Sequence, residues 1–154
     1  MNQSNRTDRA SRLIKASIGK VYSAFVDAAA LVRWLPPEGM RGEMLAFDAV
    51  PGGGYRMALS YDDAEVPGKS GEHGDVVETR YLALVPDRKI VQSAEFESED
   101  PAFAGTMVMT WTFEAAGADT RVAIECENVP QGITRRDHDA GLKSSLKNLA
   151  RFVE

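Results

Sequence analysis

The chain has 154 residues, of which 44% are hydrophobic and 27% charged, as expected for one domain with a single core. Its 18 Lys and Arg against 23 Asp and Glu give a net charge of −5, which argues against nucleic acid as a partner. The single cysteine, Cys126, excludes an intrachain disulfide and zinc sites built from several thiolates, and so favours a cytoplasmic protein. No apolar stretch approaches the about 20 residues of a transmembrane helix, so we expect no membrane insertion.

The first elements are predicted as a strand followed by two short helices. A flexible segment over residues 1–9 is expected to precede one domain over residues 10–154. Residues Ala10–Ser17 predict the opening strand, and Ser17 is a plausible N-cap for the next element. Apolar spacing then predicts a helix over Ile18–Asp27 and a second one over Ala28–Trp34, which two prolines bring to an end.

The middle of the chain predicts six strands separated by turns rich in Gly, Pro and Asp. Their ranges are Glu43–Val50, Gly54–Tyr61, Asp75–Val85, Ile90–Phe96, Thr106–Phe113 and Thr120–Glu127. Apolar and polar residues alternate along them, as in Met107, Met109 and Trp111 against Val108 and Thr110. This alternation predicts an antiparallel meander with one apolar face.

The last segment returns to helical spacing. Thr134 followed by Asp137 resembles a capping box, with Asp in place of the usual Glu. Leu142, Leu146 and Leu149 then recur at spacings of four and three residues, which predicts a long amphipathic helix with a solvated charged face. The fold class is therefore α+β, because the apolar face of a curved antiparallel sheet needs a cover and this helix is the longest amphipathic element.

Several segments resemble a known family in sequence. The run Ala16–Asp27, the run Leu31–Pro37, the turns Pro51–Arg56 and Pro86–Val91, and the glycine at 141 are similar to the activator of Hsp90 ATPase homologue (AHSA1-like) family. The resemblance covers about residues 10–153. It implies the helix-grip fold of the START-like and Bet v 1-like superfamily, in which a sheet of about seven strands wraps a C-terminal helix. The chain departs from this family at Leu142, where many relatives carry Trp.

A cavity between the inner face of the sheet and the C-terminal helix is the expected binding site. Met side chains adapt to irregular shapes, and Tyr or Trp combine an apolar body with a polar tip, so these residues suit an apolar or amphipathic ligand. The same residues are also compatible with ordinary core packing. The candidate lining residues are Trp34, Tyr55, Met57, Tyr61, Met107, Met109, Trp111, His138 and Leu142. The loop Asp62–Gly74 is long enough to form a rim or lid.

Motifs for other chemistry are weak in this sequence. Neither histidine has a partner at metal-ligand spacing, so we expect no metal, and no cofactor motif is complete. Three functions follow in order of preference. The first is a binder of a small apolar or amphipathic molecule. The second is an interaction module, with a chaperone or a second copy as partner. The third is a cyclase- or hydrolase-like enzyme that uses His138 with a tyrosine.

Overall fold

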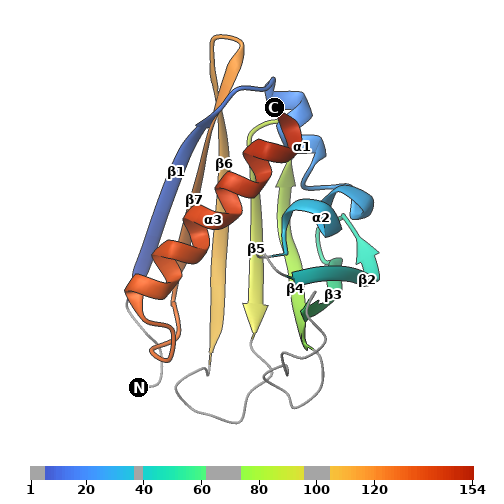
Figure 1. Ribbon diagram of the computed structural model, residues 1–154, viewed down its shortest axis with the longest axis vertical. Helices are drawn as coiled ribbons and strands as arrows, with labels where there is room; N and C mark the ends of the chain where they lie inside the picture. Colours follow the sequence, from blue (N-terminus) through green and yellow to red (C-terminus); the bar gives the residue numbers. More distant parts are fainter. Residues whose placement is uncertain (1–5, 37–39, 62–73, 96–104) are drawn as a thin grey trace.

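Figure 1 shows a computed structural model of the protein, which describes residues 6–36, 40–61, 74–95 and 105–154. Seven strands and three helices make up these ranges. In chain order they are β1 (Thr7–Ile14), α1 (Ile18–Ser23), α2 (Ala28–Trp34), β2 (Met40–Asp48), β3 (Gly54–Tyr61), β4 (Gly74–Val85), β5 (Lys89–Glu95), β6 (Thr106–Ala116), β7 (Asp119–Glu127) and α3 (Arg135–Val153).

One antiparallel sheet holds all seven strands in the order β1-β7-β6-β5-β4-β3-β2. The last strand, β7, thus returns to pair with the first strand, β1. Strands β2 to β7 pair with one another in chain order as a meander. Helix α3 crosses one face of the sheet diagonally, starting beside β1 and ending near α1 (Figure 1). The predicted α+β helix-grip architecture is confirmed, including the two short helices after the first strand.

Boundaries in the first part of the chain differ from the prediction, and the opening strand runs over Thr7–Ile14 rather than Ala10–Ser17. The sequence predicts a flexible segment over residues 1–9, whereas β1 already begins at Thr7, which pairs with Glu127. The helix predicted up to Asp27 ends at Ser23. Asp27 has extended backbone and its Oδ1 accepts a hydrogen bond from the Ala29 N–H at 2.9 Å. Because an N-cap residue cannot be helical, the chain must leave α1 before it can start α2.

The 19-residue helix α3 begins and packs as its sequence predicts. Thr134 is the N-cap, and its Oγ1 accepts a hydrogen bond from the Asp137 N–H at 3.1 Å. The buried residues of α3 are Leu142, Leu146, Leu149, Ala150 and Val153. They join residues of the sheet and of both short helices in one hydrophobic core. Among the described helices, none is both long and apolar enough to span a membrane.

Candidate functional site

The predicted lining residues of β3 and β6 lie on the inner face of the sheet, which we define as the face that carries the core. Tyr55, Met57, Met107 and Trp111 are buried, and Met109 is half-buried. All five contribute to the same core as Leu142 of α3. Tyr61 belongs to β3, but its side chain lies outside the described part of the structure, as does most of the loop predicted to form a lid.

One end of the inner face is closed by aromatic side chains, here called the aromatic plug: Tyr22, Phe25, Trp34, Trp111 and Phe113. Phe25 is central, and its ring meets that of Trp111 edge-to-face at 4.8 Å. The Trp34 indole N–H donates to the Ala24 carbonyl at 2.9 Å. The two predicted tryptophans therefore fill this end of the core with their polar atoms already engaged.

A polar row runs across the inner face through five neighbouring strands. Strand register places Asp8 opposite Cys126, Cys126 opposite Met109, Met109 opposite Gln92 and Gln92 opposite Tyr81. Directly opposed residues of an antiparallel pair point to the same side, so these five side chains share one face. Asp8 and Gln92 are among the buried polar residues of the described chain. The candidate site therefore includes polar groups that the predicted lining set lacks.

Gln92 is a buried residue that the sequence analysis did not select. Its side chain lies between Met109 and Tyr81, and its Oε1 accepts a hydrogen bond from the Trp111 indole N–H at 3.1 Å. The alternation of Ile90, Gln92 and Ala94 could have shown that Gln92 faces inward, since its two neighbours are apolar.

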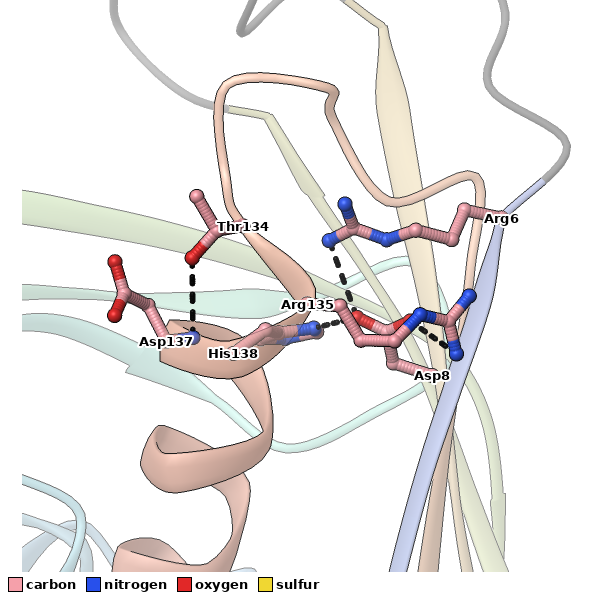
Figure 2. A network of polar contacts seen from close by, with 6 residues as sticks. All are labelled: Arg6, Asp8, Thr134, Arg135, Asp137 and His138. Carbon is pink, nitrogen blue, oxygen red and sulfur yellow. Dashed lines mark hydrogen bonds and ion pairs between the residues drawn. The ribbon is translucent and has the colours of Figure 1, made fainter.

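A charged network joins β1 to the first turn of α3 (Figure 2). The Asp8 Oδ2 lies 2.7 Å from His138 Nδ1 and 3.1 Å from a guanidinium nitrogen of Arg6. A guanidinium nitrogen of Arg135 lies 3.7 Å from the other Asp8 oxygen, Oδ1. The Asp8 side chain is 5% exposed and that of His138 13%, whereas that of Arg135 is 68% exposed. One buried carboxylate thus contacts three basic side chains at the N-terminus of α3.

The surroundings of Asp8 favour its ionised form. Burial of the carboxyl group raises its pKa, but this effect is outweighed by the hydrogen bond from His138 and by the charge and hydrogen bond of Arg6. The net result is a pKa lowered below the ordinary value. The Cys126 thiol responds differently, because burial, with a smaller contribution from the Asp8 charge, raises its pKa to about 12. Cys126 is therefore a protonated core thiol with little nucleophilic character.

The enzyme hypothesis requires His138 and a tyrosine hydroxyl in one pocket. The Tyr81 hydroxyl donates to the Phe25 carbonyl at 3.3 Å, and Tyr55 shares a side-chain hydrogen bond with Thr79. Tyr81 lies four strands from Asp8 in the polar row, which is roughly 19 Å along the sheet. Within the described ranges, no hydrogen bond links His138 to a tyrosine. Among the side chains that the structure describes, His138 therefore has an acidic partner and no tyrosine partner.

The outer face of the sheet carries an open groove of about 440 Å³ that the sequence did not predict. Its residues come from β1, β6 and β7: Arg9, Ala10, Ser11, Thr110, Thr112, Ala123, Ile124 and Glu125. Register places Ala123 between Ser11 and Thr112, so small side chains form the floor. Arg9 and Glu125 form an exposed ion pair at 3.0 Å. No cluster of three or more metal-ligating side chains occurs among the residues that the structure describes.

Comparisons with known proteins agree with this architecture. The family described as activator of Hsp90 ATPase homolog 1-like protein matches residues 15–154. A crystal structure of a protein from Chromobacterium violaceum is 32% identical, covers 96% of each chain and has a TM-score of 0.83. The solution structure of an AHSA1-like protein from Aeromonas hydrophila is 17% identical, covers 94% of this chain and 91% of its own, and has a TM-score of 0.70. No curated protein matches the sequence.

Proposed function

The chain belongs to the activator of Hsp90 ATPase homolog 1-like family, and we propose that it binds a small apolar or amphipathic molecule between the inner face of its sheet and α3. The observation that carries the proposal is the composition of the inner face beyond the aromatic plug. There Met57, Met107 and Met109 lie among the buried polar side chains Thr79 and Gln92. Flexible thioether side chains with a few polar groups are typical of a ligand-binding surface.

The aromatic plug supports this proposal because it forms one end of the single hydrophobic core. Phe25, Trp34 and Trp111 pack against one another and provide a rigid end wall. Along the sheet from this wall, Met109 is only half-buried although its neighbours in the polar row, Cys126 and Gln92, are buried. Met109 is therefore the lining residue that we expect a bound molecule to cover.

Native mass spectrometry of the protein purified from its own host tests the proposal. We expect an extra mass that disappears when the protein is denatured. Met109→Trp fills the inner face and should abolish this mass, with Met109→Phe as a milder substitute if the first variant does not fold. Val108→Trp is the matched control, because Val108 is the preceding residue of β6 and faces the other side of the sheet.

The opposite result has a clear meaning. If the protein carries no extra mass and also fails to take up small apolar compounds in solution, the binding proposal is wrong. A protein partner then becomes the preferred explanation of the fold, and a pull-down from the host would be the next experiment.

A further inference from the structure

The sheet has two edge strands, β1 and β2, which lie on opposite sides of the molecule (Figure 1). At the β1 edge, α3 packs against the strand and is tied to it by the contact between Asp8 and His138. Strand β2 pairs with β3 along one side, and no strand of the described ranges pairs with its other side. Such a side carries backbone N–H and C=O groups that can form a ladder with another chain.

The contact between the end of α2 and β2 lies over the face of the strand. A Cβ atom at Gly42 would lie 2.9 Å from Cγ of Pro36, which follows α2, and 2.9 Å from Sδ of Met57. Met57 belongs to the inner face of the sheet, so Pro36 packs on that same side of Gly42. Because a Cβ in a strand points out of the plane of the sheet, this packing does not lie along the hydrogen-bonding edge.

The outer face of β2 carries two exposed residues of opposite charge, Arg41 and Glu43, on either side of Gly42. If two copies of β2 pair antiparallel with Gly42 facing Gly42, Arg41 of each copy lies opposite Glu43 of the other. Opposed residues of an antiparallel pair have Cβ atoms about 4.5 to 5.5 Å apart, which is close enough for an ion pair. The same register places Met40 opposite Met44 on the inner face, where both side chains are half-buried.

The charges also disfavour the neighbouring registers. Moving the two-fold axis by one residue places Arg41 opposite Arg41, or Glu43 opposite Glu43, and directly opposed like charges are destabilising. The regular part of the strand ends after Met44, because the pairing of β2 with β3 shifts register between Met44 and Ala46. The pattern thus selects one register for a short ladder over Met40–Met44, and a short ladder predicts a reversible association.

We infer that the free edge of β2 binds a second copy of this chain. The two β2 strands pair antiparallel about a two-fold axis at Gly42, and two ion pairs between Arg41 and Glu43 fix the register. Such a contact uses the same surface on both copies, so it closes a dimer and does not propagate. The inference concerns the edge of the sheet and is independent of the proposed ligand.

Sedimentation equilibrium of the whole chain, from about 1 µM to 1 mM, measures the dissociation constant of the dimer. Arg41→Glu and Glu43→Arg each convert both ion pairs into pairs of like charge. We expect either variant to raise the dissociation constant by about tenfold or more. Mixing the two variants restores opposite charges across the axis, so the mixture should form a heterodimer about as tight as the wild-type dimer. The double variant with both substitutions should also dimerise.

Matched charge changes elsewhere control for the effect of net charge. Arg88→Glu, in the turn between β4 and β5, and Glu114→Arg, on β6, alter exposed residues in the same two ways. Both should leave the dissociation constant unchanged. Trp34 and Trp111 lie in the core, so their fluorescence shows whether each variant retains the fold.

Two results would overturn the inference. One is a wild-type protein that stays monomeric over the whole concentration range. The other is a wild-type dimer that neither single reversal weakens, or a mixture of the two variants that associates no more tightly than each variant alone, because the dimer would then use another surface or register. Either result leaves the proposed binding of a small molecule on the inner face untouched.

Discussion

Replacing Asp8 with Asn tests whether ionisation of this carboxyl group stabilises the contact between β1 and α3. Asn preserves the shape of the side chain but removes its charge from beside Arg6 and His138. Hydrogen bonds to charged groups contribute about 1.5 to 3 kcal/mol each, and Asp8 makes two, at 2.7 and 3.1 Å. The Arg135 pair is longer and exposed, so it adds less than about 1 kcal/mol.

Burial of the carboxylate opposes these gains, so the sum of the individual bonds overstates the effect. We expect Asp8→Asn to lower the free energy of unfolding by roughly 2 to 4 kcal/mol at pH 7. Urea denaturation followed by tryptophan fluorescence measures this difference. Asp139→Asn is the control on the same helix, because Asp139 pairs with Lys143 at the surface and its loss should cost no more than about 0.5 kcal/mol.

The lowered pKa of Asp8 also predicts how the stability difference between wild type and Asp8→Asn depends on pH. The pKa of Asp8 is lower in the folded chain than its ordinary value of 3.8. At a pH between these two pKa values, the unfolded chain therefore binds more protons than the folded chain. The stabilisation is therefore complete above about pH 5 and is lost as the pH falls through the lowered pKa of the folded state. The difference between wild type and Asp8→Asn should shrink on acidification. A difference that is absent at neutral pH, or that does not change with pH, would refute the role of ionisation.

Three further predictions concern the core. The Cys126 thiol, whose pKa is raised to about 12, should resist a thiol reagent in the native protein at pH 8 and react fully in urea; rapid native reaction would contradict its burial. Gly54→Ala would place a Cβ against the backbone oxygen of Thr79, so we expect a loss of roughly 2 to 4 kcal/mol and a lower melting temperature in calorimetry. Trp34→Phe loses the hydrogen bond to Ala24 and part of the ring volume, and urea denaturation should show a cost of roughly 2 to 3 kcal/mol.

Local signals in the sequence predicted the elements well because their causes are local. Ser17 and Thr134 accept the N-terminal hydrogen bonds of α1 and α3, as their residue types predict. The range Ala28–Trp34 matches α2, where Asp27 caps one end. Strand edges were less accurate, since β2 runs from Met40 to Asp48 rather than over Glu43–Val50. Strand ends depend on pairing with β3, which a single segment does not encode.

The polar part of the site depends on contacts between distant segments. Asp8 and His138 are 130 residues apart, and Asp8 lies in a stretch that composition alone marks as flexible. Alternation predicts that Gln92 faces inward, but only the structure shows Trp111 beside its oxygen. Sequence periodicity thus identifies the apolar inner face of the sheet, while the partners that orient each polar group come from the tertiary arrangement of β1, β5 and α3.

The two ends of the inner face are stabilised by different interactions, and this difference separates stability from binding. At one end, Phe25 and Trp34 pack with their polar atoms satisfied inside the chain. At the start of α3, the Asp8 carboxylate holds the helix to the edge strand by accepting a hydrogen bond from His138. In the middle of the sheet, Gln92 joins β5 to the aromatic plug by accepting the indole N–H of Trp111, whereas Met109 on the neighbouring strand is only half-buried. Within the described chain, Met109 makes no hydrogen bond to either arrangement, and so substitutions at Met109 should change ligand binding more than they change stability.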